Sequence, residues 1–257
     1  MGLEILLEDT HETFYWVGFI LADGYITKNN RLKIRIAEKD LLHLKKFGIF
    51  VDENVIIYNN QACLIVQNKK IISPFKEKFE ISNRKTYEPP SINIFLNFDS
   101  KLLLSLIIGF IDGDGSITYQ YNRTDALLRI KNHKSWLEIL TFFHKIISHE
   151  SNIDFPSPKI NNQGYSSLIC SNLKILQYLK QHTIEYHLPV LKRKWDKIDI
   201  NRISRCDSAE SNKIEILKLN EMGYKQREIA KIMNLSRSRV SVILSNDRKK
   251  IANERNY

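Results

Sequence analysis

The sequence predicts an α+β protein made of two pseudo-symmetric αββαββα units followed by a small all-α domain. A nine-residue pattern occurs twice, as WVGFILADG at residues 16–24 and as IIGFIDGDG at residues 107–115. Each copy opens a similar series of strand patterns and helical patterns, and beyond residue 211 only helical patterns remain. We expect a first unit with its linker at 1–98, a second unit at 99–200, a connector at 201–211 and a C-terminal module at 212–257.

Each copy of the pattern is an apolar helical run with small residues four positions apart. This spacing places Gly18 and Ala22 on one helix face, and Gly109 and Gly113 on one face of the other helix. Side chains this small allow two helix backbones to approach closely. If the two helices pack together, the acidic residues that follow, Asp23 and Asp114, lie side by side at their C-terminal ends.

This placement of Asp23 and Asp114 is electrostatically unfavourable. The C-terminal end of a helix is negative, and a second carboxylate nearby adds to the repulsion. A divalent cation between the carboxylates would relieve it, and hard oxygen ligands favour magnesium or calcium. The alternative is a purely structural one, in which each buried helix simply closes with an Asp–Gly turn.

The elements expected after the first motif are a strand at 25–27, a turn at 28–30 and an alternating strand at 31–36. A helix at about 39–47, strands at 55–58 and 62–67, and a helix at 69–79 complete the unit, and residues 88–99 form the linker. Along the alternating strand Leu32, Ile34 and Ile36 face the core. The opposite face carries Arg31, Lys33 and Arg35.

The second unit repeats this order. We expect strands at 116–121, 127–131 and 167–170, a turn at 122–125, and helices at 135–148 and 173–181, with an irregular segment at 156–162. Residues 35–36 correspond in pattern to 129–130. The alternating strand of the second unit exposes Arg129 and Lys131. Basic rows of this kind suit a phosphate backbone, although an ordinary solvated strand face is the common alternative.

The charge distribution indicates a basic C-terminal segment, and the cysteine pattern indicates a reducing environment. Of the net charge of +10, residues 212–257 contribute +6, which favours a polyanionic partner. Cys63, Cys170 and Cys206 show no disulfide or metal-ligand spacing, and the first two are expected to be buried thiols in an intracellular, reducing compartment, either a bacterial or phage cytoplasm or an organelle. The longest apolar run, 102–111, is too short to cross a bilayer, so we expect no membrane partner.

The C-terminal module resembles a helix-turn-helix. A helix at 212–221 with apolar Ile214, Leu217 and Leu219 is followed by helices at 225–233 and 237–244, separated by a turn at 234–236. Ala230 stands where the first helix of such a motif must remain small, and Ile229, Val240 and Ile243 would fill the core. Asn234 tolerates the left-handed conformation that the turn requires, and Ser236 is placed to cap the last helix.

This resemblance implies a second DNA-binding element, joined to the first by a flexible connector at 202–211. The alternative is a helical hairpin that contacts protein. The residues expected to contact DNA are Gln226, Arg237, Ser238, Arg239 and Ser241.

The paired motifs themselves resemble the LAGLIDADG homing endonucleases in their single-chain, two-motif form, over about residues 10–200. The resemblance implies that the motif helices form a pseudo-twofold interface, that the sheets form a DNA-binding saddle in the major groove, and that the last acid of each motif binds the catalytic metals. Asp23 and Asp114 stand at those positions, and the metal site is expected to include Ala22 and Gly113. Leu21 replaces an acid that the second motif keeps as Asp112.

The family also places basic residues near the cleavage centre, after the last helix of each unit. Residues 83–86 and 191–194 resemble those regions. The resemblance implies catalytic roles for Lys85 and Lys192, with Lys194 as a further candidate. Glu38 and Asn132 stand where family members often organise the attacking water.

The implied activity is a double-strand break across the minor groove of a long double-stranded DNA target, made by a monomer. The resemblance implies two or three Mg²⁺ ions as cofactors, with Ca²⁺ or Mn²⁺ as possible substitutes. The gene would belong to a mobile intron, an intein-derived element or a free-standing element. Two other functions stay open. One is a transcription regulator that has lost cleavage, although the retained acidic pair favours the nuclease. The other is an intron maturase that binds its own intron RNA.

Overall fold

The structure is a computed structural model that describes residues 2–119, 126–203 and 205–254. The chain divides into two compact units, residues 1–200 and residues 201–257. The turn expected at 122–125 and the end of the strand expected at 116–121 lie outside the described residues. Among the described helices, none is long and apolar enough to cross a membrane.

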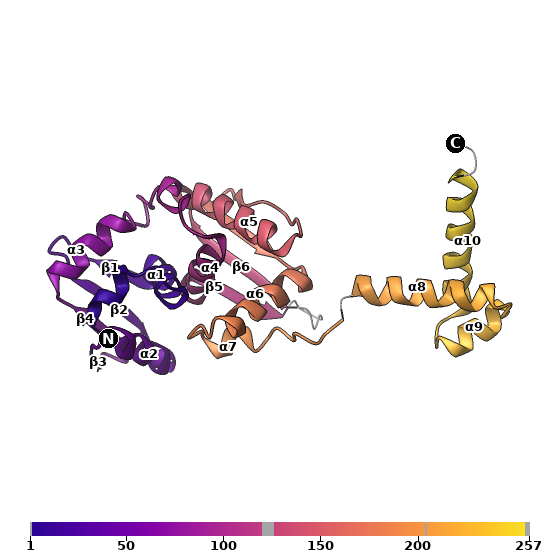
Figure 1. Cartoon of the computed structure of the whole chain (residues 1–257), viewed down its shortest axis with the longest axis horizontal. Helices are drawn as coiled ribbons and strands as arrows, with labels where there is room; N and C mark the ends of the chain where they lie inside the picture. Colours follow the sequence, from indigo (N-terminus) through magenta and orange to yellow (C-terminus); the bar gives the residue numbers. More distant parts are fainter. Residues whose placement is uncertain (1, 120–125, 204, 255–257) are drawn as a thin grey trace. The chain divides into compact units, whose positions relative to one another are not determined.

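The first half of the larger unit contains the expected helices and strands in the expected order (Figure 1). Its strands form a four-stranded antiparallel sheet in the order β1-β2-β4-β3. Three short 3₁₀ helices, η1 (Leu3–Leu7), η2 (Glu38–Asp40) and η3 (Ile92–Phe95), accompany them. The elements are α1 (His11–Asp23), β1 (Gly24–Ile26), β2 (Leu32–Ala37), α2 (Leu41–Val51), β3 (Val55–Tyr58), β4 (Gln61–Val66) and α3 (Lys69–Lys78).

The second half repeats this plan with the sheet order β5-β6-β8-β7. Strand β7, which has only two residues in a Pro- and Asn-rich segment, was not expected from the sequence. The elements are α4 (Ser100–Asp114), β5 (Gly115–Tyr119), β6 (Ala126–His133), η4 (Lys134–Trp136), α5 (Leu137–Ser151), β7 (Lys159–Ile160), β8 (Tyr165–Cys170), α6 (Leu173–Glu185) and α7 (Lys192–Trp195).

The strand register shows which residues of the two halves are equivalent. The glycine that begins β1 pairs with Ile34, and the glycine that begins β5 pairs with Ile130. Ile34 and Ile130 also pair with the matching leucines of β4 and β8. The correspondence expected between residues 35–36 and 129–130 is therefore wrong by two positions, because repeated hydrophobic alternation fits a strand equally well after such a shift.

Helices α1 and α4 pack against each other at the centre of the unit, where Figure 1 shows them side by side. A Cβ atom added at Gly18 would lie 1.8 Å from the carbonyl oxygen of Leu106, and one at Gly109 would lie 1.8 Å from that of Tyr15. The two backbones are thus in direct contact, which only glycine permits. The predicted packing of the motif helices through their small residues is confirmed.

The core of the larger unit surrounds this helix pair. The side chains of α1 from Thr13 to Leu21 are buried, and the alternating side chains of β2 and β6 close the core from the sheets. Cys63 and Cys170 are free, buried thiols, as expected. The side chain of Cys206 lies outside the described side chains.

The smaller unit consists of α8 (Arg205–Glu221), α9 (Gln226–Ile232) and α10 (Arg237–Glu254). Helix α8 begins within the segment expected as a flexible connector, so residues 205–211 are helical. Ile216, and not the expected Ile214, enters the core of this unit, because Ile214 is 50% exposed. The other core residues are Leu219, Ile229, Ala230, Val240 and Leu244, with Leu217 and Ile243 partly buried beside them.

The turn between α9 and α10 has the geometry that the sequence predicts. Asn234 has a φ of 50°, in the left-handed region. The hydroxyl oxygen of Ser236 accepts a hydrogen bond of 3.3 Å from the backbone nitrogen of Arg239 and so caps α10. Both expectations for this turn are confirmed.

Candidate functional site

Asp23 and Asp114 are the last residues of α1 and α4, and they meet where the two helices end. A Cβ atom added at Gly113 would lie 2.2 Å from the Cβ atom of Ala22, so the helices remain in contact up to their final residues. Both carboxylates reach the surface. Partial burial and the negative charge of Asp114 raise the pKa of Asp23 to about 6, and partial burial also raises the pKa of Asp114. The two charges therefore interact and repel each other.

A lysine neutralises the end of each motif helix. The Nζ atom of Lys85 donates hydrogen bonds to the carbonyl oxygens of Ile20 (3.2 Å), Leu21 (2.6 Å) and Ala22. The carbonyl of Ile20 also accepts the backbone N–H of Gly24, the residue that caps the helix. The ammonium group supplies donors to the carbonyls of Leu21 and Ala22 in the last turn and offsets the negative helix end. Burial lowers the pKa of Lys85 to about 8, although the charges of the two aspartates oppose this shift.

Lys194 occupies the matching position at the end of α4. Its Nζ atom donates to the carbonyl oxygens of Ile111 (2.9 Å), Asp112 (2.6 Å) and Gly115 (2.7 Å). Burial lowers the pKa of this group too. Lys192 is exposed on α7. The geometry therefore places Lys194, and not the first choice Lys192, at the second helix end.

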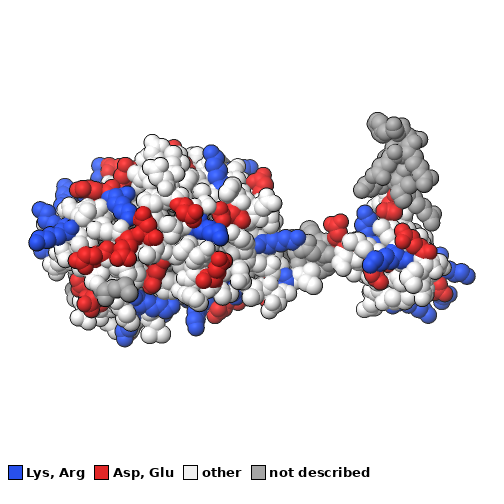
Figure 2. Space-filling view, viewed as in Figure 1, with Lys and Arg blue, Asp and Glu red and all other residues white. Residues whose placement is uncertain are grey.

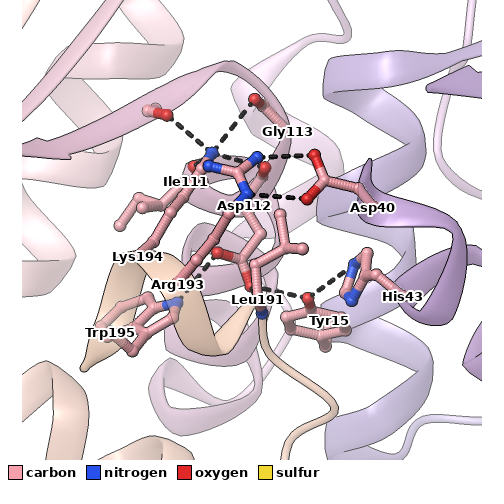
Figure 3. Close-up of polar contacts among 11 residues, drawn as sticks. Tyr15, Asp40, His43, Ile111, Asp112, Gly113, Leu191, Arg193, Lys194 and Trp195 are labelled. Carbon is pink, nitrogen blue, oxygen red and sulfur yellow. Dashed lines mark hydrogen bonds and ion pairs between the residues drawn. The ribbon is translucent and has the colours of Figure 1, made fainter. Parts of the chain in front are cut away.

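Asp112 explains why α7 presents Lys194 in this way (Figure 3). Its side chain is 2% exposed. One carboxylate oxygen accepts hydrogen bonds from the hydroxyl of Tyr15 (2.7 Å) and the backbone nitrogen of Leu191 (2.9 Å), and the other accepts one from Nε1 of Trp195 (2.9 Å). These bonds fix both ends of the turn that carries Lys194. Burial raises the pKa of Asp112, whereas the hydrogen bonds lower it.

The equivalent of Asp112 in the first motif is Leu21, which is buried. Asp112 is therefore a buried acid whose carboxylate binds residues inside the protein and does not lie beside Asp23 and Asp114 at the surface. The sequence contained no signal for this role, because the partners of Asp112 lie 79 to 97 residues away along the chain.

A hollow of about 300 Å³ opens beside Asp23. Its walls include Arg35, Asp40 and Arg193. The guanidinium group of Arg193 forms a two-bond ion pair with Asp40, with Nε 2.7 Å from Oδ1 and Nη2 2.6 Å from Oδ2. This ion pair holds the pKa of Asp40 below its usual value and was not expected from the sequence.

The surroundings of the two aspartates differ. The side-chain nitrogen of Asn132 donates a hydrogen bond of 2.9 Å to Asp114. By strand register, the equivalent residue near Asp23 is Ile36, which lines the hollow. Glu38, the other residue expected to organise the attacking water, is exposed in η2 and corresponds in register to Lys134.

The basic strand residues predicted to contact DNA alternate with buried residues. Arg35, Arg129 and Lys131 are exposed, Lys33 is half-buried, and Arg31 is exposed just before β2. The first three, with Lys33, occupy one face of their strands, as expected from the alternation. The face of the larger unit in view in Figure 2 carries acidic and basic side chains side by side.

The residues predicted to contact DNA from the smaller unit lie on α9 and α10. Gln226 is half-buried at the start of α9. The others are exposed in the first two turns of α10, namely Arg237, Ser238, Arg239 and Ser241.

The capacity of the site to hold a metal rests on the pair of aspartates. Within the described residues, no group of three or more His, Cys, Asp or Glu side chains could hold a metal ion. The two carboxylates are nonetheless hard oxygen donors at the surface whose mutual repulsion a cation would relieve, so the donor set fits a hard divalent cation such as magnesium or calcium. The carbonyl oxygens of Ala22 and Gly113, expected in the metal site, already accept hydrogen bonds from Lys85 and Lys194.

Comparisons with known proteins identify the fold. No protein-family model and no curated protein matches the sequence. Among solved structures, a lysine-to-alanine mutant of I-SmaMI aligns with a TM-score of 0.50 at 15% identity, over 87% of this chain and 99% of that chain. The LAGLIDADG homing endonuclease I-GzeII, in complex with its DNA target, aligns with a TM-score of 0.50 at 12% identity, over 86% of this chain and 96% of that chain. The chain therefore has the fold of a LAGLIDADG homing endonuclease.

Proposed function

We propose that this protein is a site-specific double-stranded DNA homing endonuclease that hydrolyses one phosphodiester in each strand. The observation that carries the proposal is the duplicated helix end, where Asp23 and Lys85 face Asp114 and Lys194. A pair of equivalent acidic centres suits a substrate with two equivalent strands. The shared fold with I-GzeII, whose structure contains a DNA target, supports the same substrate here.

Asp23 and Asp114 would hold the divalent ions, with Mg²⁺ as the expected metal. Bound there, Mg²⁺ would supply a more acidic water molecule and would stabilise negative charge on the reacting phosphate. Lys85 and Lys194 place a positive charge beside each carboxylate, which also favours an anionic phosphate at the same position. Asn132 orients the carboxylate of Asp114.

The remaining predicted residues would bind the duplex. The exposed face of β2 and β6 would contact the phosphate backbone through Arg31, Lys33, Arg35, Arg129 and Lys131. The smaller unit would act as a helix-turn-helix whose α10 presents Arg237 and Arg239 to the DNA. Because the two units belong to one chain, binding by one raises the effective concentration of the other.

The proposal is tested by incubating the purified protein with its own flanking genomic DNA and Mg²⁺. A discrete double-strand cut is expected. Asp114→Asn and Asp23→Asn should each lower the cleavage rate by about 100-fold or more and leave DNA affinity nearly unchanged, because each removes one charged ligand. Asp52→Asn, at the exposed end of α2, is the matched control and should cut at the wild-type rate.

Two results would overturn the proposal. Tight, sequence-specific binding with no cut in Mg²⁺, Mn²⁺ or Ca²⁺ would instead favour a DNA-binding regulator with this fold. Unchanged cutting by Asp114→Asn would remove the role assigned to the paired carboxylates.

A further inference from the structure

Two short segments carry the lysines to the ends of the motif helices. The first lysine segment, residues 82–88, follows the first half and brings Lys85 to α1. The second lysine segment, residues 189–195, follows the second half and brings Lys194 to α4. Neither segment belongs to a long helix or a sheet, so contacts made by its neighbours must fix its position.

The first lysine segment is held by the second half of the unit. Nε1 of Trp136 donates a hydrogen bond of 3.1 Å to the carbonyl oxygen of Lys85 itself. The hydroxyl of Ser135 donates one of 2.9 Å to the carbonyl oxygen of Thr86. Both donors belong to η4, and Trp136 is buried.

The second lysine segment is held by the first half. Asp40, the last residue of η2, binds the guanidinium group of Arg193, the neighbour of Lys194. The Nζ atom of Lys46 donates to the carbonyl oxygens of Pro189 (3.2 Å) and Val190 (3.3 Å).

One residue of each set, Asp40 and Trp136, stands at an equivalent position by strand register. Ile34 and Ile130 pair with the first residues of β1 and β5, and Asp40 and Trp136 follow them at the same distance along the chain. The short helices η2 and η4 therefore stand at matching positions. Each of them binds the segment that belongs to the opposite half, so the contacts cross the pseudo-twofold interface.

We propose that Asp40 and Trp136 are positioning residues, and that each half of the unit aligns the lysine of the other half. Asp40 positions Lys194 through the ion pair with the neighbouring Arg193. Trp136 positions Lys85 through the hydrogen bond to the backbone carbonyl of Lys85. Given the proposed endonuclease, which this inference extends, each positioning residue governs cleavage of one strand. A cut by one centre thus depends on an intact partner half.

The positioning itself is tested without DNA, by the rate at which an amine-acylating reagent labels each lysine, followed by mass spectrometry. Asp40→Asn should raise the labelling rate of Lys194 by about tenfold and leave that of Lys85 unchanged, because it removes a charge-assisted hydrogen bond. Trp136→Phe should have the opposite selectivity. Asp40→Glu keeps the carboxylate and should restore much of the protection of Lys194.

The strand assignment is tested with a duplex labelled separately on each strand. Asp40→Asn should accumulate DNA nicked in one strand, and Trp136→Phe should accumulate DNA nicked in the other, with target affinity unchanged. A general folding defect would instead slow both strands equally in both variants, and that result would overturn the inference. A variant in which the labelling rates of Lys85 and Lys194 change equally would also overturn the inference.

The two tests fail independently. If the wild-type protein cuts no DNA, the proposed function is wrong, but the labelling of the two lysines still decides whether Asp40 and Trp136 position them.

Discussion

The side-chain nitrogen of Asn132 lies 2.9 Å from a carboxylate oxygen of Asp114, to which it donates a hydrogen bond. At the equivalent position in the first half stands Ile36, a side chain with no hydrogen-bond donor. The two acidic centres therefore have equivalent helices and lysines but differ in the side chain that faces the carboxylate.

Replacing Asn132 with leucine should raise the pKa of Asp114. The hydrogen bond stabilises the ionised carboxylate and lowers its pKa, so its loss adds to the increase that partial burial already causes. Carboxyl ¹³C chemical shifts followed by NMR titration would measure this change. The converse variant, Ile36→Asn, should lower the pKa of Asp23 from its value of about 6. An unchanged titration of Asp114 in Asn132→Leu would contradict the role of this bond.

Acid should destabilise the larger unit through His43. This side chain is 3% exposed, and burial lowers its pKa to about 3 from 6.5. The unfolded chain therefore binds a proton that the folded chain excludes, so stability is full above pH 6.5 and falls as the pH decreases toward 3. At pH 5 the loss from this one residue is about 2 kcal/mol. Urea unfolding at a series of pH values would measure it.

His43→Gln should lower the stability at pH 7.5 but reduce its dependence on pH. His182→Gln is the matched comparison, because burial also lowers the pKa of His182, to about 4. Each variant should therefore remove part of the acid sensitivity. An undiminished slope between pH 7 and pH 4 in the His43 variant would show that the imidazole is not the group responsible.

The contact between Gly113 and Ala22 should be sensitive to a single methyl group. Gly113→Ala would place its Cβ atom 2.2 Å from that of Ala22 and should cost about 1–3 kcal/mol of unfolding free energy. The double variant with Ala22→Gly moves the methyl group to the other helix and should recover most of this loss. If the double variant is no more stable than Gly113→Ala, the close contact is not the cause.

The smaller unit should contribute affinity without affecting the chemical step. Arg239→Ala should weaken DNA binding and reduce the slope of log affinity against log salt by about one, because one phosphate contact is lost. The single-turnover cleavage rate on saturated DNA should not change. Lys218→Ala removes the same charge from the exposed face of α8 and is the control. A slower rate at saturation in Arg239→Ala would count against this division between the units.

The sequence was sufficient to predict the duplicated plan and the helix pair, because both depend on local patterns. Small residues four apart, followed by Asp–Gly, occur twice, and the strand alternation follows each copy. Strand β7 was missed because two residues contain no measurable alternation. The residue Ile216 was missed because the weak apolar pattern of α8 fits more than one helix face.

The choice between Lys192 and Lys194 could not be made from local sequence patterns. Four consecutive residues, 191–194, offer two lysines, and contacts with distant residues, such as the bonds from Leu191 and Trp195 to Asp112, determine which of them points to α4. The ion pair between Asp40 and Arg193 joins residues 153 positions apart, and each looks like an ordinary surface charge in the sequence. Contacts of this kind depend on the assembled fold.

The backbone contacts at Gly18 and Gly109 also limit how the larger unit can change shape. With carbonyl oxygens directly against the facing glycines, α1 and α4 cannot rotate or slide without collision. In the proposed endonuclease, these contacts would hold the two sheets at a set angle before a duplex binds. A target that does not match this angle must bend or twist to fit, so the mechanical compliance of the nucleic acid would itself become a basis for selection.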